Sequence, residues 1–292
     1  MDAPGAAAMR FVIVGTGRCG TTFLRNILSR HPDCFVCSES YWHAVLLAKY
    51  GDSPAPASQL LADIESVRFH DGRSTLDANL RLIGTALPEF LGDITESLAG
   101  RMVDVKTVCS AIESEILRRT RKTIFADKTP HYGYHLAELR RLSPDLKVVH
   151  VVRDGRDCAV SMSQHGGYQL LAGIGVDNWT QVAAVADRLR EPPLVTDLGA
   201  YLDMWARQAT QISAAARTCP EAACLTVHYE TMVAQPMRFL RHMVDFLQLR
   251  GDPDWLAAAA AEVAAPPRPD AAIAAISPSQ YALAALAAHG YG

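Results

Sequence analysis

Short apolar runs alternate along the chain with longer stretches in which apolar residues return at helical spacing. The first run, Arg10–Gly15, is followed by a glycine-rich turn and then by a helical pattern made by Phe23, Leu24, Ile27 and Leu28. A continuous apolar run of this length is typical of a fully buried strand, and recurrence every three or four residues predicts a helix. The chain therefore opens with a strand, a turn and a helix, the order of a phosphate-binding site.

Four more strands are predicted from apolar runs, and helical patterns separate them. The strands are expected at Cys34–Cys37, Thr123–Asp127, Lys147–Val152 and Ala223–Glu230. The helices are expected at about 41–49, 58–67, 78–99, 110–121, 131–142, 200–218 and 236–249. Strands joined by helical crossovers predict an α/β, P-loop-containing fold with a mainly parallel central sheet flanked by helices.

Two segments have no readable period. The glycine-rich segment 166–175, "GGYQLLAGIG", is expected to break regular structure, and the tail from Ala257 predicts only a short helix near 279–288. No repeat or linker divides the chain, so we expect a single domain over residues 1–292 with an N-terminal tail at 1–9.

Charge and apolar content exclude several partners. The net charge is only -3, which provides no general attraction for nucleic acid or an anionic membrane surface. Asp2 precedes an apolar run of only four residues, Phe11–Val14, so neither a signal peptide nor a membrane span is predicted, and we expect a cytoplasmic protein.

The chain has seven cysteines, an odd number, and Cys34 and Cys37 lie in an apolar run. We therefore expect reduced, mostly buried thiols there rather than metal or redox chemistry.

The first candidate site is the loop Gly15–Thr22. It nearly follows the nucleotide-binding pattern G-x-x-x-x-G-K-[ST], but Thr21 stands where that pattern has lysine, and Arg18 comes three residues earlier. Glycine-turn N–H groups, a helix N-terminus, two threonine hydroxyls and an arginine together favour an anion. An ordinary tight turn before an N-capped helix is the alternative.

The second candidate site is Arg153–Ser161, "RDGRDCAVS", which follows a predicted strand. It places Arg153 at the carboxyl edge of the sheet, where open α/β sheets bind ligands. Two anion sites at one sheet edge predict a nucleotide with phosphates at both ends of its ribose. The alternative is a solvated ion-pair cluster of Arg153, Asp154, Arg156 and Asp157.

The segments "GTGRCGTTFLRNIL" and "VVRDGRDCAVS" together resemble the two cofactor-binding segments of sulfotransferases that use 3'-phosphoadenosine 5'-phosphosulfate. The resemblance continues through "NILSRHPDCFVCSES", "ADKTPHYGYHLAELRRLSPDLKVVHVVRDGRD" and "LTVHYETMVAQPMRFLRHMVDFLQL". It covers about Phe11–Lys49, Ile124–Ser163 and Ala223–Leu249, and its motifs are most similar to the Golgi-type branch, which includes the protein-tyrosine sulfotransferases. It implies a sulfotransferase-like fold.

The resemblance also implies cofactor-binding roles. The 5'-phosphosulfate would be held by the loop residues Arg18, Cys19, Gly20, Thr21 and Thr22, and the 3'-phosphate by Arg153 and Ser161. Cys19 replaces the family's usual serine and Gly17 a common proline, although the backbone donors remain. Apart from the resemblance, Trp179, Trp205 and Tyr229 are candidates to stack on adenine or acceptor, with a core position as the alternative for each, and Tyr229 is kept as the cofactor-binding residue. The C-terminal R-K-G segment of cytosolic relatives is absent; Arg268 and Ser279 are substitutes between which the sequence does not choose.

The chemistry implied is in-line transfer of a sulfuryl group to an acceptor oxygen, with release of adenosine 3',5'-bisphosphate. The match to the protein-tyrosine branch makes Glu39, 21 residues after Arg18, the general base, and Lys128 and Arg18 the groups that stabilise charge. No metal is expected, because the sulfuryl group carries less charge than a phosphoryl group. Helix capping by Glu39 and a surface position for Lys128 are the alternatives. Reserve bases are Asp127, His131 and His228.

The acceptor has no motif. We expect a hydroxyl-bearing small metabolite or lipid, with a protein tyrosine as the alternative, and a homodimer is compatible with the sequence. Two other classes stay open. One is a P-loop kinase that transfers a phosphoryl group, and the other is a nucleotide-binding module without catalysis.

Overall fold

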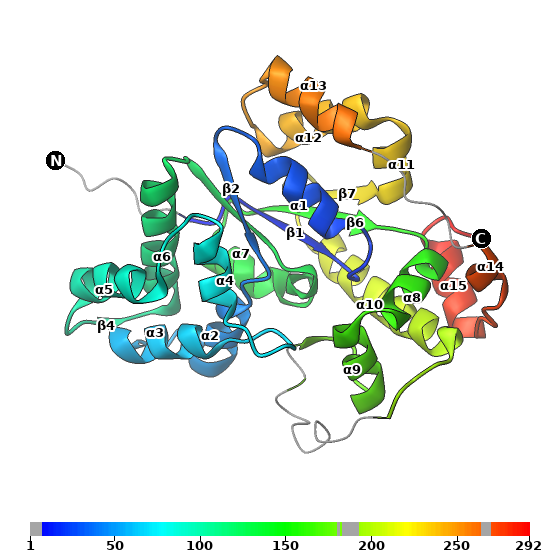
Figure 1. Ribbon diagram of the computed structural model, residues 1–292, viewed down its shortest axis with the longest axis horizontal. Helices are drawn as coiled ribbons and strands as arrows, with labels where there is room; N and C mark the ends of the chain where they lie inside the picture. Colours follow the sequence, from blue (N-terminus) through cyan, green and yellow to red (C-terminus); the bar gives the residue numbers. More distant parts are fainter. Residues whose placement is uncertain (1–7, 180–181, 183–192, 264–269) are drawn as a thin grey trace. The chain divides into compact units, whose positions relative to one another are not determined.

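The computed structural model describes residues 8–179, 182, 193–263 and 270–292 (Figure 1). The chain forms two compact units. The first comprises Met1–Ile13 and Thr22–Lys147, and the second comprises Val14–Thr21 and Val148–Gly292. The glycine-rich loop therefore belongs to the second unit, although most of the N-terminal half belongs to the first. The prediction of a single domain stays a prediction.

The first unit contains the parallel strands β2 (Cys34–Ser38), β5 (Ile124–Lys128) and β1 (Phe11–Gly15), in the order β2-β5-β1. All five residues of β1 are buried, as the apolar run predicts. In the register of β2 on β5, Ser38 lies opposite Lys128. A two-residue antiparallel pair, β3 (Ala55–Pro56) with β4 (Met102–Val103), lies outside this sheet.

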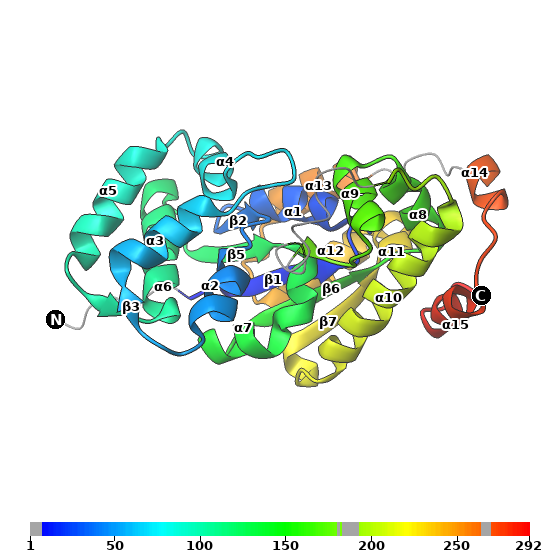
Figure 2. The same cartoon turned by 90° about the horizontal axis from the view of Figure 1, so that it is seen from below.

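Helices of the first unit lie beside these strands and beyond one end of them, and several are packed together in Figure 2. Within the described residues they are α1 (Thr21–Ser29), α2 (Trp42–Tyr50), α3 (Ala57–Ser66), α4 (Thr75–Arg81), α5 (Leu87–Leu98), α6 (Val105–Thr120), the 3-10 helix η1 (Pro130–His135) and α7 (Leu136–Leu142). Their capping is visible in the sequence at α6, whose N-cap Asp104 accepts a hydrogen bond from the Thr107 N–H.

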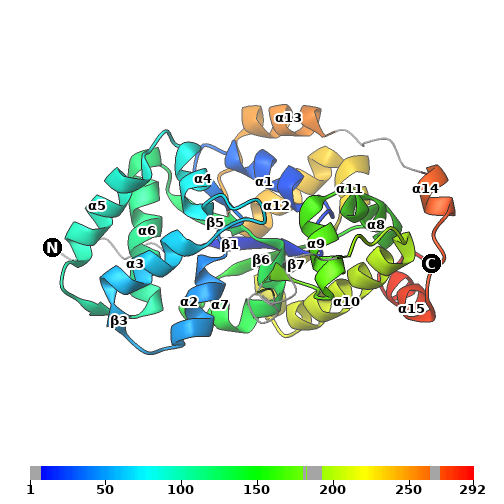
Figure 3. The same cartoon turned by 60° about the horizontal axis from the view of Figure 1, so that its bottom comes forward.

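In the second unit, the end of β1 is followed in strand order by β6 (Lys147–Val152) and β7 (Cys224–His228), and β6 and β7 are parallel. Helix α10 lies along this part of the sheet, and α8 and α9 lie beside α10 (Figure 3). The helices are α8 (Gly155–Ser163), α9 (Gly166–Ile174), α10 (Leu198–Arg217), η3 (Glu221–Ala223), α11 (Tyr229–Ala234), α12 (Pro236–Leu247), α13 (Pro253–Glu262), α14 (Asp270–Ala274) and α15 (Gln280–Ala288).

The predicted fold class is confirmed, because a mainly parallel sheet is flanked by helices. Some element predictions were wrong, and caps explain why. The glycine-rich segment is the helix α9: the His165 ring accepts the Gly167 N–H at its start, and Gly175 ends it in the left-handed conformation. The expected helix 78–99 is two helices, since Gly84 is left-handed and Pro88 lies in the first turn of α5, where proline fits a new helix start.

The ends of two other elements also differ from the prediction. Strand β7 stops at His228, because Tyr229 already begins α11. The segment around Ala257 is helical within α13, which starts at Pro253 after the N-cap Asp252. Among the described residues, no helix is both long enough and apolar enough to cross a membrane.

Candidate functional site

The glycine-rich loop has an unusual backbone. Gly17, Arg18 and Gly20 have φ angles of 77°, 55° and 97°, and α1 begins directly afterwards at Thr21. Left-handed residues before a helix start turn successive N–H groups toward one concave point, which favours an anion. For Arg18, an L-residue with a side chain, this conformation costs about 1–2 kcal/mol. The loop therefore adopts a conformation that is unfavourable for a plain turn and that suits anion binding.

Two aromatic side chains occupy the space beside the loop glycines Gly17 and Gly20. A Cβ on Gly17 would lie 1.5 Å from Tyr168 Oη, and a Cβ on Gly20 would lie 2.4 Å from Tyr229 Cδ2. The Tyr168 hydroxyl also donates a 3.5 Å hydrogen bond to the Thr16 carbonyl. The Tyr168 hydroxyl therefore occupies the space that a side chain at position 17 would need. Sequence reasoning missed Tyr168, since it lies on α9.

The structure brings the two predicted anion-binding segments together. Arg18 Nε donates to Ser161 Oγ at 3.0 Å, although the two residues are 143 positions apart. Arg153 Nη1 donates to the Arg18 carbonyl at 3.3 Å, and the Arg153 guanidinium lies 4.5 Å from the centre of the Tyr229 ring. Arg18, Gly20, Arg153, Ser161 and Tyr229 therefore form one cluster in the second unit, with two guanidinium groups and an aromatic ring.

The turn before α8 is held by its own ion pair. Asp154 caps α8 by accepting the Arg156 N–H, and the Arg156 side chain pairs with the same carboxylate at 2.9 Å. Glu230 accepts the Asp154 N–H at 3.0 Å, and the Tyr291 hydroxyl donates to Glu230 at 2.7 Å. The ion-pair interpretation therefore applies to Arg156 and Asp154. Arg153 is also 3.9 Å from Asp157, but its guanidinium faces the loop and Tyr229.

The remaining loop residues differ in exposure. The Thr21 side chain is buried and Thr22 is exposed. Cys19 is fully buried, and burial raises the pKa of its thiol. A Cβ on Gly15 would lie 2.6 Å from Cys19 Sγ, so this thiol packs against the end of β1. Any contribution of Cys19 to ligand binding therefore comes from its backbone N–H.

In the first unit, Glu39 and Lys128 form an ion pair. Lys128 Nζ donates to Glu39 Oε1 at 2.5 Å; the lysine side chain is only 1% exposed and the glutamate side chain 31%. Parallel pairing of β2 with β5 explains the contact, because Ser38 lies opposite Lys128 and Glu39 follows at the strand end. Lys128 is thus a buried cation, not a surface lysine, and Glu39 is a carboxylate that solvent can reach. Glu39 is also left-handed, with φ 52°.

The reserve bases of the first unit are less suited to proton transfer. Asp127 is fully buried and accepts a 2.6 Å hydrogen bond from Thr129, and burial raises its pKa. His131 is 1% exposed, and burial lowers its pKa to about 4, which makes it a weak base at neutral pH. Glu39, the more exposed group, is the better placed of the three.

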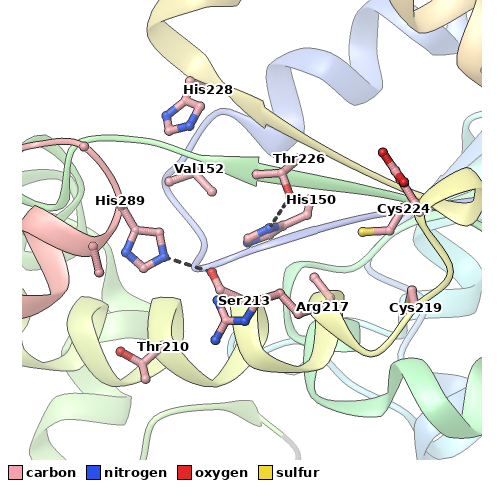
Figure 4. A pocket seen from close by; sticks show the side chains of 14 residues that line it. His150, Val152, Thr210, Ser213, Arg217, Cys219, Cys224, Thr226, His228 and His289 are labelled. Atoms are coloured by element: carbon pink, nitrogen blue, oxygen red, sulfur yellow. Dashed lines mark hydrogen bonds between the residues drawn. The ribbon is translucent and has the colours of Figure 1, made fainter.

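The second unit also holds a cavity of about 740 Å³ between β6, β7 and α10, with a mixed polar and apolar lining (Figure 4). His150, Ser213, Arg217 and His289 are directed toward it, and the His289 ring is 2.9 Å from Ser213 Oγ. Burial, followed by the nearby charges of other cavity residues, lowers the pKa of His150 to about 4. His228, the last reserve base, lines this cavity and contacts the Tyr291 hydroxyl at 3.1 Å.

Several other candidates from the sequence have structural roles. Ser279 caps α15, and its hydroxyl donates to Asp203. Arg268, the other candidate for the C-terminal part of the cofactor site, lies outside the described residues. Trp205 is fully buried against Gly155, as expected of a core aromatic. Cys34 and Cys37 are buried, and burial raises the pKa of Cys34 to about 12. Among the residues that the structure describes, no three His, Cys, Asp or Glu side chains are grouped to hold a metal ion.

The fold is that of the α/β sulfotransferases. It is similar to the sulfotransferase domain from the curacin biosynthetic pathway, with a TM-score of 0.64, 14% identity and 99% of each chain covered. It is also similar to the sulfotransferase domain of the Synechococcus PCC 7002 olefin synthase, with a TM-score of 0.58, 17% identity, and 100% of this chain and 98% of that chain covered. Residues 10–254 match the model of the sulfotransferase family, and the chain belongs to that family. No curated protein matches the sequence.

Proposed function

We propose that the protein transfers a sulfuryl group from 3'-phosphoadenosine 5'-phosphosulfate to the hydroxyl of a small metabolite or lipid. The observation that carries this proposal is the contact of Arg18 with Ser161, together with Arg153 on the carbonyl of Arg18. These contacts join a helix-start anion site to a second arginine site. A donor with phosphate groups on both sides of one ribose matches that arrangement better than a triphosphate does.

The cluster fits such a donor. The left-handed loop and the start of α1 offer backbone N–H groups for the 5'-phosphosulfate, with Arg18, Thr21 and Thr22 as side-chain donors. Arg153 and Ser161 would hold the 3'-phosphate. Tyr229 is half-exposed beside Arg153, so its ring can stack on adenine.

Transfer of the sulfuryl group needs one base, which removes the proton of the acceptor hydroxyl. The acceptor oxygen forms a bond to sulfur, the bond between sulfur and the phosphate oxygen breaks, and adenosine 3',5'-bisphosphate leaves with that electron pair. Glu39 takes the proton of the acceptor hydroxyl. The Lys128 and Arg18 cations stabilise the charge that grows on the leaving oxygen, so we propose that transfer needs no metal. We expect the transfer to be in line, with the acceptor oxygen opposite the leaving oxygen at sulfur.

The acceptor assignment is the least constrained part of the proposal. The sequence motifs are most similar to the Golgi-type branch, and on that similarity a protein tyrosine is the second candidate acceptor. The low net charge of -3 favours a small or neutral acceptor over a highly sulfated polysaccharide.

The test is a transfer assay with labelled donor. The purified protein is incubated with ³⁵S-labelled phosphosulfate, a metabolite extract and excess EDTA, and sulfated products are identified by mass spectrometry. A parallel reaction contains a tyrosine-rich acidic peptide. A sulfated small molecule with release of adenosine 3',5'-bisphosphate is expected. Hydrolysis of ATP that requires magnesium, without consumption of phosphosulfate, would show a kinase instead, and donor binding with no product from any acceptor would show a non-catalytic module.

A further inference from the structure

At the end of strand β2, a side chain pairs with the backbone edge that faces away from β5. Among the described residues, β2 is an edge strand of its sheet and pairs with β5 alone. At Ser38, the last residue of β2, the side-chain amide of Asn79 accepts the backbone N–H at 2.7 Å and donates to the backbone carbonyl at 3.0 Å. The carboxamide therefore pairs with both backbone polar groups of Ser38, as a neighbouring strand would.

Asn79 is itself firmly placed. It lies in α4, is 1% exposed, and its amide also donates to the Thr75 carbonyl at 2.8 Å. A buried amide that satisfies three backbone partners has little freedom to rotate. Asn79 is therefore a rigid clamp on the residue that precedes Glu39.

The residues after Ser38 are held in the same way. The Glu39 N–H donates to the Lys128 carbonyl at 2.8 Å, and the buried Thr75 hydroxyl donates to the Ser40 carbonyl at 3.0 Å. Ser40 Oγ lies 2.9 Å from the hydroxyl of Tyr132, which is fully buried. Backbone and side-chain contacts thus hold three consecutive residues, Ser38, Glu39 and Ser40.

These contacts matter because the segment has an unfavourable backbone. Glu39 and Tyr41 both have positive φ, 52° and 58°, and neither is glycine or asparagine. Such conformations persist only where surrounding contacts determine them, and they are concentrated at functional sites. Without the clamp, Glu39 would sample extended and right-handed conformations that carry its carboxylate away from Lys128.

We propose that Asn79 is a positioning residue for the base: its amide holds the end of β2, so that Glu39 stays left-handed with its carboxylate on Lys128. The inference rests on the proposed function, in which Glu39 removes the acceptor proton. Thr75, from the same helix, supports the clamp through Ser40. A displacement of about 1 Å at a reacting group can lower the rate about 100-fold, so the loss of Asn79 is expected to lower the turnover number, not donor binding.

The experiment compares Asn79→Ala with the neighbouring core variant Leu80→Ala. Leu80 is also fully buried in α4, but the side-chain hydrogen bonds to Ser38 come from Asn79, so this variant disturbs the helix and leaves the bonding groups in place. Initial rates of adenosine 3',5'-bisphosphate release are measured at saturating phosphosulfate with a fixed amount of metabolite extract. We expect Asn79→Ala to lower the turnover number about 10- to 100-fold, with the KM for phosphosulfate changed less than about 3-fold. Leu80→Ala should stay within about 3-fold of the unmodified protein.

A double-mutant cycle shows whether Asn79 acts through Glu39. In the Glu39→Gln background, Asn79→Ala should have almost no further effect, because the group it positions is absent. Thr75→Val, which replaces the hydroxyl with a methyl group of the same size, is a milder variant for the case that Asn79→Ala does not fold. It should lower turnover about 3- to 10-fold. Amide exchange of Ser38, followed by NMR, should speed up at least about 10-fold in Asn79→Ala.

The outcomes separate the two proposals. Full turnover in Glu39→Gln would contradict the role of Glu39 as base. A large effect of Glu39→Gln combined with near-normal turnover in both Asn79→Ala and Thr75→Val would overturn the positioning role alone. An equal effect of Asn79→Ala in the unmodified protein and in the Glu39→Gln background would also overturn it, because Asn79 would then act on something other than the base.

Discussion

The ion pair between Glu39 and Lys128 leads to an asymmetric prediction about stability. Removing the carboxylate with Glu39→Gln leaves a cation that is 1% exposed beside a neutral amide. Removing the cation with Lys128→Met leaves a carboxylate that is 31% exposed and can be hydrated. Both substitutions should abolish most of the transfer activity, but only the first should destabilise the protein.

The magnitudes follow from burial. Breaking a fully buried pair by removing one partner costs about 3–5 kcal/mol. Here water reaches the carboxylate and glutamine retains an oxygen that accepts from Lys128, so we expect Glu39→Gln to cost about 2 kcal/mol. Methionine matches the lysine stem and removes the desolvation cost of the ammonium group, so Lys128→Met should change the free energy of unfolding by less than about 1 kcal/mol. With an unfolding entropy of about 2.1 cal/mol/K per residue, 2 kcal/mol lowers the melting temperature of a chain this long by about 3 °C.

The assay is thermal unfolding of both variants beside transfer kinetics. Glu89→Gln is the matched control, because Glu89 is 65% exposed and pairs with Arg119 at the surface. It should shift the melting temperature by less than about 1 °C and leave transfer unchanged. Transfer should fall about 100- to 10,000-fold in Glu39→Gln. If Lys128→Met proves as destabilising as Glu39→Gln, or more so, it is wrong that the buried lysine depends on its carboxylate partner more than the hydrated carboxylate depends on the lysine.

Three further predictions concern the loop and the buried histidines. Gly20→Ala should weaken binding of adenosine 3',5'-bisphosphate at least about 10-fold in calorimetry, because its Cβ would displace the Tyr229 ring and φ is 97°. Arg18→Ala should lower the transfer rate about 100- to 1,000-fold, and a near-normal rate would remove the arginine from catalysis. Burial lowers the pKa of His150 and of His131 to about 4, below the unfolded value of 6.5. The stability that depends on each neutral ring is therefore fully present above pH 6.5 and is lost as the pH falls toward 4. The free energy of unfolding, measured with urea, should fall by about 3 kcal/mol per histidine over that range. His150→Gln should make this dependence on pH less steep.

Much of the candidate site could be predicted without the fold. The strand, glycine turn and helix order at Gly15–Thr22 predicts a helix-start anion site, and Arg153 was expected at the same carboxyl edge of the sheet. The family resemblance added Ser161 to this second site. The contact of Arg18 with Ser161 agrees with that expectation. These features could be predicted because they are local: apolar runs, glycines and the order of elements depend only on residues that are neighbours in the sequence.

Other contacts depend on helices whose positions the sequence does not reveal. Tyr168 lies on α9, where the glycines at both ends belong to helix caps rather than to a break. Asn79 is in a seven-residue helix, and nothing in its neighbours indicates that its amide reaches Ser38, 41 positions away. A polar side chain that pairs with distant backbone leaves no periodic signal.

The sequence by itself determined the α/β fold, the loop that favours an anion and the family to which the chain belongs. It did so because buried strands, glycine turns and charged loop residues are local choices of side chain. Only the tertiary structure decided that Lys128 is a buried cation against Glu39, that Tyr168 occupies the space beside Gly17, and that Asn79 completes the edge of β2. Strand register and helix placement set these contacts, and both depend on the free energy of packing the whole chain, not on any one segment.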